Sequence, residues 1–217
     1  MRKRYVEGAK DLINAHPDLI INIDKIEMIN FRSKFNNDLP IHVEIGMGKG
    51  IFIHTLAKNN PNINYIGIER FDSIIVKALD KVIENPLKNL ILLRTDAVDL
   101  NHLIEKGSIN RIYLNFSDPW PKARHEKRRL TSHKFLDRYK RLLLPNSELH
   151  FKTDNLGLFD FSVEELTNYP MDIIYITRDL HNSDFVGNIM TEFESKFAKR
   201  GNLIYKLTAK FKENENG

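Results

Sequence analysis

The sequence predicts an α/β fold, in which a mostly parallel sheet of seven strands has helices on both faces and follows an N-terminal extension. Two observations predict this class. From residue 41 onward, short apolar runs alternate with segments of helical period, and Pro86, Pro145 and Gly201 end three of those segments. In parallel sheets of this kind, ligands bind outside the carboxyl ends of the strands. The residues that follow each strand are therefore the candidates for a functional site.

The expected strands are short and apolar, and most are separated by an expected helix. The strands are residues 41–45, 65–68, 90–93, 111–116, 148–153, 173–176 and 203–211. The helices are residues 50–58, 72–85, about 100–104, 131–144, 156–168 and 191–200, with Asp72 and either Thr131 or Ser132 as helix caps. We accordingly expect an extension over residues 1–40, one domain over residues 41–212 and a polar tail over residues 213–217.

Composition excludes several classes of protein. The 217 residues are enough for one core, and 41% hydrophobic with 29% charged residues is ordinary for a globular protein. Cysteine is absent, which excludes disulfides, thiol nucleophiles and thiolate metal sites. No apolar segment follows the basic N-terminus as in a signal peptide, and no apolar run approaches the ~20 residues of a membrane helix. We expect a cytoplasmic protein with no membrane partner and no metal.

Positive charge is concentrated in one part of the chain. The net charge is +4, but residues 117–141 contain nine Lys or Arg and three Asp or Glu, a local charge of +6. The rest of the chain is therefore slightly acidic. Such a concentration favours an anionic partner at this segment, and a solvated helix face is the alternative explanation.

Three glycines follow the first expected strand. Gly46, Gly48 and Gly50 let the backbone pass close to a ligand and place a helix N-terminus toward it. A dinucleotide fingerprint would need Gly or Ala where Ile51 stands. Glu44 lies two residues before the first glycine, where a carboxylate would repel a pyrophosphate and attract a cationic ligand. The turn alone is a weak signal, because any tight strand-to-helix turn favours glycine.

Carboxylates also follow the next three strands. Glu69, Asp96 and Asp118 stand at the ends of the second, third and fourth strands. Glu69 is at the position where an acidic residue takes up ribose hydroxyls, and Asp96 could accept from an exocyclic amine such as adenine N6. The alternative is that each residue caps the helix that follows it. With Glu44, the four carboxylates favour S-adenosylmethionine, which carries sulfonium and ammonium cations, a ribose diol and an adenine.

An unusual stretch follows the fourth strand. Asp118-Pro119-Trp120-Pro121 precedes Lys122, and we expect its two prolines to hold the chain extended. Trp120 is the only tryptophan, and it serves either as a stacking platform for a base or as an apolar plug over the core. A basic segment follows directly, and its side chains are suited to phosphate contacts: Arg124, His125, Lys127, Arg128 and Arg129.

Two further groups lie near the last strands. Asp154 follows the fifth strand and adds another carboxylate to the same edge of the sheet. Thr191 and Glu194 have the spacing of a capping box, in which threonine and glutamate satisfy each other's backbone amides. Physical reasoning on the residues alone favours this structural interpretation over contact with a substrate.

The motifs 44–50, 118–122, 124–129, 151–155 and 191–194 together resemble the bacterial tRNA (guanine-N7)-methyltransferase family, over residues 41–205 and in matching order. The resemblance implies a Rossmann-like class I methyltransferase that methylates N7 of the variable-region guanine, position 46, of tRNA. It implies that Glu44, Glu69, Asp96 and Asp118 bind S-adenosylmethionine or shape its site. It also implies that Lys122, Asp154, Thr191 and Glu194 contact the substrate and that residues 124–129 contact RNA. At position 193, Phe193 stands where relatives are expected to have tyrosine.

This chemistry needs no general base, because guanine N7 carries a lone pair and no proton. Positioning, desolvation and electrostatics are then sufficient, with Asp118 expected to orient the transfer and S-adenosylhomocysteine as the other product.

Two alternatives remain: a methyltransferase for an exocyclic amine of a base, since Asp118-Pro-Trp-Pro121 is similar to an N6-adenine motif, or a nonenzymatic RNA-binding protein with this fold. The sequence does not distinguish a monomer from a homodimer.

Overall fold

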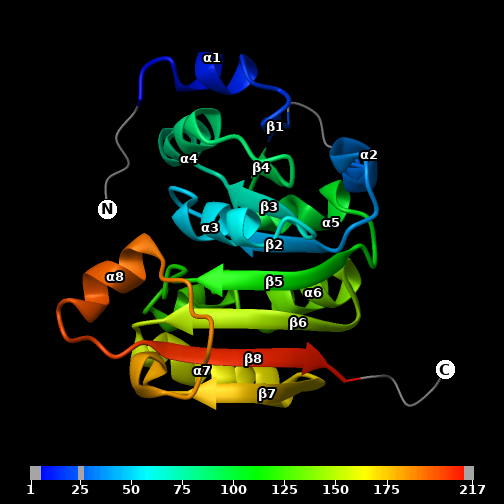
Figure 1. Cartoon of the computed structure of the whole chain (residues 1–217). Helices are drawn as coiled ribbons and strands as arrows, with labels where there is room; N and C mark the ends of the chain where they lie inside the picture. The colour runs from blue at the N-terminus through cyan, green and yellow to red at the C-terminus, as the bar shows by residue number, and fades with distance from the viewer. Residues whose placement is uncertain (1–5, 24–26, 213–217) are drawn as a thin grey trace. The chain divides into compact units, whose positions relative to one another are not determined.

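The computed structural model describes residues 6–23 and 27–212, so the predicted tail at 213–217 lies outside the described residues. The chain divides into two compact units, Met1–Glu105 and Lys106–Gly217. Figure 1 shows the helices and strands of each. Eight strands are found in the described residues, four in each unit, against the seven predicted. The α/β class and the alternation of strands and helices are confirmed.

The first unit contains four parallel strands in the order β1-β4-β3-β2. In chain order its elements are α1 (Ala9–Asn14), β1 (Ile20–Asn22), α2 (Phe31–Phe35), β2 (Ile41–Ile45), α3 (Ile51–Asn59), β3 (Asn64–Glu69), α4 (Asp72–Glu84), β4 (Leu90–Arg94), the 3-10 helix η1 (Ala97–Asp99) and α5 (Leu100–Leu103). The additional strand is β1, whose Ile20 pairs with Leu92 of β4. Part of the N-terminal extension is therefore built into the sheet.

Every residue of β2 and β3 is buried, including the polar His42 and Glu44 of β2, as expected for parallel strands that are covered on both faces. Helix α4 packs through Ile75, Ala78, Leu79 and Val82, whose spacing places them on one face of the helix. Its predicted cap is wrong by one position. Phe71 is the N-cap, and Asp72 is the first helical residue, where it forms an ion pair with Arg94.

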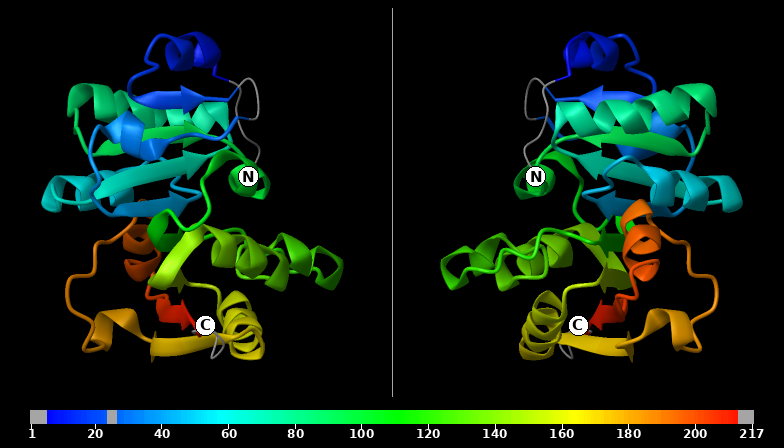
Figure 2. Two further views of the ribbon diagram at one scale, coloured as in Figure 1. Left: turned by 90° about the vertical axis from the view of Figure 1, so that its right-hand side faces the viewer. Right: turned by 90° about the vertical axis from the view of Figure 1, so that its left-hand side faces the viewer.

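The second unit contains strands in the order β5-β6-β8-β7, and Figure 2 shows its helices from two sides. Its elements are β5 (Ile109–Asn115), the 3-10 helix η2 (Ala123–Arg128), α6 (His133–Leu142), β6 (Leu143–Thr153), α7 (Leu156–Asn168), β7 (Met171–Thr177), the 3-10 helix η3 (Leu180–Asn182), α8 (Glu192–Ala198) and β8 (Tyr205–Phe211). Strands β5 and β6 are parallel, and β8 runs antiparallel to both β6 and β7. No helix among the described residues is long and apolar enough to cross a membrane.

A charged cluster connects neighbouring strands of the second unit. Glu148 of β6 accepts from Arg111 of β5 at 2.7 Å and interacts with the His150 Nε2 at 2.7 Å. The hydrogen bond from His150 and the charge of Arg111 lower the pKa of Glu148 to about 2 despite its partial burial. Burial lowers the pKa of His150 from 6.5 to about 4, against the stabilising effect of Glu148 on its charged form. Both groups therefore resist protonation in the folded state.

These pKa values predict an acid-sensitive fold. Below about pH 6.5 the unfolded chain binds a proton at His150, whereas the folded chain does not until about pH 4. The free energy of unfolding should therefore fall by about 2–3 kcal/mol from this residue between those two pH values. His150→Gln should remove that part of the slope in denaturant unfolding measured from pH 7 to pH 4. His133→Gln, at an exposed histidine of α6, is the control and should leave the slope unchanged. Equal slopes in the wild type and His150→Gln would contradict the assignment.

Candidate functional site

The glycine turn between β2 and α3 is held against the end of β3. The backbone amides of Gly46 and Met47 both donate to the carbonyl of Ile68 at 2.9 Å. Gly46 and Gly48 have φ angles of 77° and 59°, in the left-handed region that favours glycine. A Cβ placed on either glycine meets nothing within 4 Å. The turn therefore has open space beside its backbone, and at these two positions glycine is required by conformation rather than by crowding.

Gly50 is restricted in a second way. Its φ is 71°, it is the N-cap of α3, and a Cβ there would lie 3.0 Å from the Cβ of Ala78. Close packing of α3 against α4 therefore also requires the third glycine. The predicted glycine positions are explained by this turn, and their contact with a cofactor stays a prediction.

The carboxylates of the first unit differ in their surroundings. Glu44 is buried within β2, at 2% exposure. Glu69, at 8% exposure, ends β3, and its Oε1 accepts from the amides of Arg70 at 2.9 Å and Phe71 at 3.1 Å. Asp96 Oδ1 accepts from the amide of Val98 at 3.1 Å as the cap of η1, and its Oδ2 accepts from Arg70 at 2.8 Å. Asp96 therefore caps η1, as the alternative explanation predicted. A ligand at Asp96 would have to bind while the carboxylate also accepts from Val98 and Arg70.

A cavity of about 530 Å³ lies at the ends of β3 and β4 within the first unit. Its volume is within the usual range for small-molecule sites. The residues that line it include Arg70, Phe71, Thr95 and Asp96, with Ile23 contributed by the segment after β1. These residues can bind a small polar ligand that has an apolar ring. The open glycine turn, the two buried carboxylates and this cavity fit the parts of S-adenosylmethionine.

In the second unit, the backbone after β5 departs at two residues from the extended conformation expected from its prolines. Phe116 and Trp120 have φ angles of 52° and 42°, in the left-handed region that costs energy for residues with a side chain. The guanidinium of Arg129 donates to the carbonyls of Pro119 at 3.1 Å and Trp120 at 3.2 Å, and it also lies over the ring of Phe161. These hydrogen bonds explain why the chain turns at Trp120. Asp118, two residues before Trp120, is exposed.

The Trp120 ring is half-buried and has cationic neighbours. The guanidinium of Arg128 lies 5.0 Å from its ring centroid, and the His125 ring is nearly perpendicular to it, with 5.7 Å between the ring centroids. The tryptophan is therefore held among side chains of the basic segment, instead of being fully enclosed as a plug.

The predicted RNA-binding residues divide into two groups. Arg124, Lys127 and Arg128 are exposed on η2, as is Lys122 before it, and all are accessible to phosphates. Arg129 is half-buried and holds the turn at Trp120. The Arg129 guanidinium is therefore already engaged by the backbone, and its predicted contact with RNA stays a prediction.

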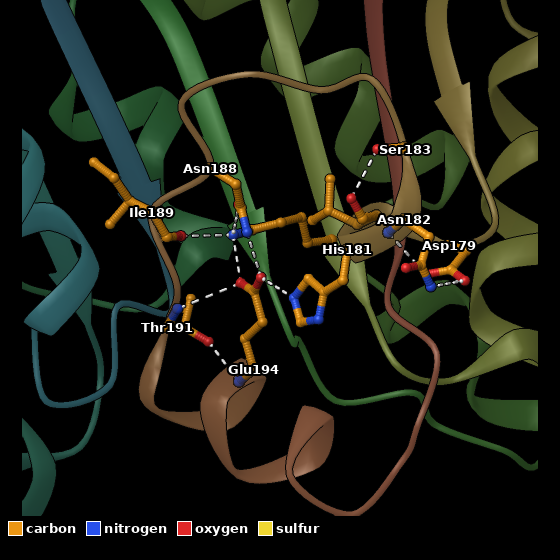
Figure 3. A network of polar contacts seen from close by, with 10 residues as sticks. Asp179, His181, Asn182, Ser183, Asn188, Ile189, Thr191 and Glu194 are labelled. Carbon is orange, nitrogen blue, oxygen red and sulfur yellow. Dashed lines mark hydrogen bonds and ion pairs between the residues drawn. The ribbon is translucent and has the colours of Figure 1, made fainter.

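Glu194 is the centre of a buried polar network (Figure 3). Its side chain is 0% exposed, and its Oε2 accepts from Lys152 Nζ at 2.7 Å. Its Oε1 accepts from Asn188 Nδ2 at 2.6 Å and lies 3.0 Å from His181 Nε2. The predicted capping box is confirmed, with Thr191 Oγ1 accepting from the Glu194 amide at 2.9 Å. Both carboxylate oxygens are thus engaged inside the protein, so the structure gives Glu194 no direct access to a substrate.

The charges of this network shift two pKa values. Burial raises the pKa of Glu194, but the charge and hydrogen bond of Lys152, with hydrogen bonds from His181 and Asn188, outweigh burial and bring it below the ordinary value. Burial and the nearby charge of Lys152 lower the pKa of Lys206 to about 7. Lys206 lies opposite Lys152 in the pairing of β6 and β8.

Sequence reasoning missed three members of this network: Lys152, His181 and Asn188. One signal was present, since Lys152 is a lysine within the strand that runs into Asp154. A lysine in a buried strand requires an anionic partner, but that partner is 42 residues away and only the fold identifies it. Asp154 is half-buried after β6 and has a long contact of 3.4 Å from Asn202.

Several solved structures have the same fold. The 16S rRNA methyltransferase KamB matches with a TM-score of 0.63 at 13% identity, covering 86% of this chain and 95% of that one. An rRNA methylase from Streptococcus thermophilus matches with a TM-score of 0.55 at 12% identity, covering 98% and 99%. A mutant of the 16S rRNA (adenine(1408)-N(1))-methyltransferase of Catenulisporales acidiphilia, solved with cosubstrate SAM, matches with a TM-score of 0.57 at 12% identity, covering 85% and 92%.

The fold is that of a Rossmann-like class I methyltransferase, as predicted, and the cofactor of this class is S-adenosylmethionine. A family model, Methyltransf_4, described as "Putative methyltransferase", matches residues 38–207. The chain belongs to this methyltransferase family.

The role of Arg129 can be tested through the only tryptophan. Arg129→Ala should release the turn and shift the fluorescence of Trp120 to longer wavelength, because two hydrogen bonds from a charged donor are lost. The free energy of unfolding should fall by about 1–2 kcal/mol, since the guanidinium is only half-buried. Arg124→Ala is the control on exposed η2 and should change neither quantity. An unchanged emission spectrum for Arg129→Ala would show that the turn does not depend on this contact.

Proposed function

We propose that this chain transfers a methyl group from S-adenosylmethionine to N7 of guanine at position 46 of tRNA. The observation that supports this most is the stretch at 118–121, which follows β5, carries the exposed carboxylate of Asp118 and leads into the basic helix η2. A methyltransferase that acts on RNA needs an electrostatic contact near its acceptor site. The motifs that resemble the tRNA (guanine-N7) family supply the identity of the base.

In this proposal the cofactor is bound by the glycine turn at 46–50 and by carboxylates. Glu44 is assigned to the cationic part of the cofactor, and Glu69 is assigned to the ribose hydroxyls. Asp96 is assigned to the adenine, at the cavity that Phe71 and Asp96 line. When bound, S-adenosylmethionine supplies an electrophilic methyl group. The buried positions of Glu44 and Glu69 strengthen their attraction for cations, because little water screens the carboxylates.

Guanine N7 forms the new bond with its lone pair as the bond between sulfur and the methyl carbon breaks. The electron pair of that bond stays on sulfur, and positive charge appears on the purine. No proton has to be removed, so the protein supplies position and charge. Asp118 is assigned to orient the transfer and to stabilise the developing cation.

Asp154 is assigned to recognise the base. A carboxylate can accept from both N1–H and the exocyclic amine of guanine, whereas the same edge of adenine lacks both of these donors. Asp154 suits this role because it is half-buried and only weakly engaged by Asn202. Lys122, Arg124, Lys127 and Arg128 contribute contacts with phosphates, with His125 and Trp120 beside them.

A different base or a different RNA is the main alternative. Methylation of adenine in rRNA is named for some proteins of similar fold, and at 12–13% identity that similarity supports only the fold. Methylation of an exocyclic amine is the second alternative, and RNA binding without catalysis is the third. Titration of S-adenosylmethionine distinguishes the third, because a protein that only binds RNA is not expected to bind this cofactor.

The expected product can be identified chemically. Unmodified tRNA treated with protein and cofactor should be cleaved by borohydride and aniline at position 46, because N7-methylguanine makes the glycosidic bond labile. Asp118→Asn should lower the rate constant of this reaction by about a hundredfold or more if the charge stabilises the transition state. Asp160→Asn, at an exposed carboxylate of α7, is the control and should keep the full rate. Methyl incorporation without strand scission would favour an amine product, and full activity of Asp118→Asn would contradict its role.

The basic segment should control the salt dependence of tRNA binding. Replacing Arg124, Lys127 and Arg128 by alanine should reduce the slope of log affinity against log salt by about two, since about three phosphate contacts are lost. The control replaces three exposed lysines of the first unit: Lys58, Lys77 and Lys88. An unchanged slope in the first variant, measured by filter binding over a range of salt concentrations, would exclude η2 as the RNA contact.

A further inference from the structure

Lys152 is buried in β6, and its ammonium group joins three separate parts of the second unit. Its side chain is 4% exposed. Its Nζ donates to Asn188 Oδ1 at 3.1 Å, to the Ile189 carbonyl at 2.9 Å and to Glu194 Oε2 at 2.7 Å. A lysine ammonium has three protons, so these acceptors match its full donor capacity. The strand is thereby connected to helix α8 and to the segment before it.

The segment between η3 and α8 depends on side chains for its position. Residues 183–190 form no helix or strand, and Val186 at its tip is 90% exposed. Glu194 Oε1 accepts from Asn188 Nδ2 at 2.6 Å and lies 3.0 Å from His181 Nε2, so the carboxylate contacts the segment near its end and η3 just before its start (Figure 3). In the first half of the segment, Lys206 Nζ lies over the ring of Phe185, 4.3 Å from the ring centroid. The hydroxyl of Tyr175 donates to Asp184 Oδ1 at 3.1 Å.

A buried ion pair of this kind is better suited to fixing geometry than to adding stability. Removing water from two charges is unfavourable, and their attraction offsets that cost only when the remaining donors and acceptors are satisfied. Here three donors besides Lys152 surround Glu194: Asn188, His181 and the Thr191 amide. Each of them lies in or beside the segment, so satisfying the carboxylate requires the segment to be in place.

We propose that Lys152 and Asn188 are positioning residues, which hold the segment 183–190 and the start of α8 on the substrate side of the second unit by way of Glu194. Glu194 then acts on the reaction through this network and not by touching the base. The inference rests on the proposed function only for its assumption that this side meets RNA. The positioning itself is a property of the protein alone.

Asn188→Ala tests the positioning without removing a buried charge. The residue is half-buried in a loop, so the fold should be retained. Chymotrypsin should cleave after Phe185 about tenfold faster than in the wild type, because the segment loses contacts with both charged partners. Asn182→Ala is the matched control, since its side-chain amide donates to Asp179, the N-cap of η3, and its cleavage rate should stay within about twofold of the wild type. Cleavage products are identified by mass spectrometry.

Kinetics distinguish positioning from a general loss of structure. For Asn188→Ala, the KM for RNA should rise about tenfold while the KM for S-adenosylmethionine and the midpoint of thermal unfolding stay unchanged. A merely structural role would reduce the active fraction and lower kcat with both KM values unchanged.

Lys152→Met should show the same rise in KM for RNA, and Lys210→Met on β8 is its control, since that lysine has only a 4.0 Å contact with Glu148.

If Lys152→Met does not fold, the double variant Lys152→Met with Glu194→Gln removes both charges of the pair and should restore folding while fast cleavage after Phe185 remains. Equal cleavage rates in Asn188→Ala and the wild type would overturn the positioning role, whatever RNA is methylated. Fast cleavage together with no methylation of tRNA by the wild type would overturn the proposed function and support the positioning. The two failures are therefore distinguishable.

Discussion

The ion pair between Lys152 and Glu194 holds helix α8 and the segment before it against strand β6 of the second unit. It joins β6 to α8 at 2.7 Å inside the protein, and the other donors around Glu194 come from η3, from the segment before α8 and from the cap of that helix. Because neither charge can reach water, the pair is satisfied only in one arrangement of that segment. The consequences extend to Lys206, whose pKa is lowered to about 7 by burial and by the charge of its neighbour.

The cofactor side of the first unit follows a different principle. The glycine turn there depends on backbone conformation, with Gly46 and Gly48 in left-handed geometry and open space beside them. Its carboxylates are fixed by amides at the start of the following helices, as Glu69 and Asp96 show. The candidate cofactor site of the first unit therefore depends on local backbone geometry, whereas the polar network of the second unit depends on side-chain contacts between distant residues.

Much of the fold could be predicted from the sequence, because local signals agreed with it. The strands at 41–45 and 90–93 and the helix at 156–168 lie where apolar periodicity and flanking caps indicated. The capping box at Thr191 and Glu194 was also readable, since its spacing is local. Strand β1 was missed because three residues carry too little periodicity, and its pairing with β4 is a long-range contact. The turn at Trp120 was missed because Arg129, nine residues later, imposes it.

The sequence by itself determined the class of protein: an α/β methyltransferase with a glycine turn, carboxylates at strand ends and a basic segment after β5. These features are local, so their residue types and spacing are sufficient to identify them. Only the tertiary structure decided what several of these residues do. Glu194 is enclosed by Lys152, Asn188 and His181, and Arg129 holds a turn, because contacts between residues distant in sequence assign side chains to the interior. Periodicity and motif spacing carry no information on those contacts.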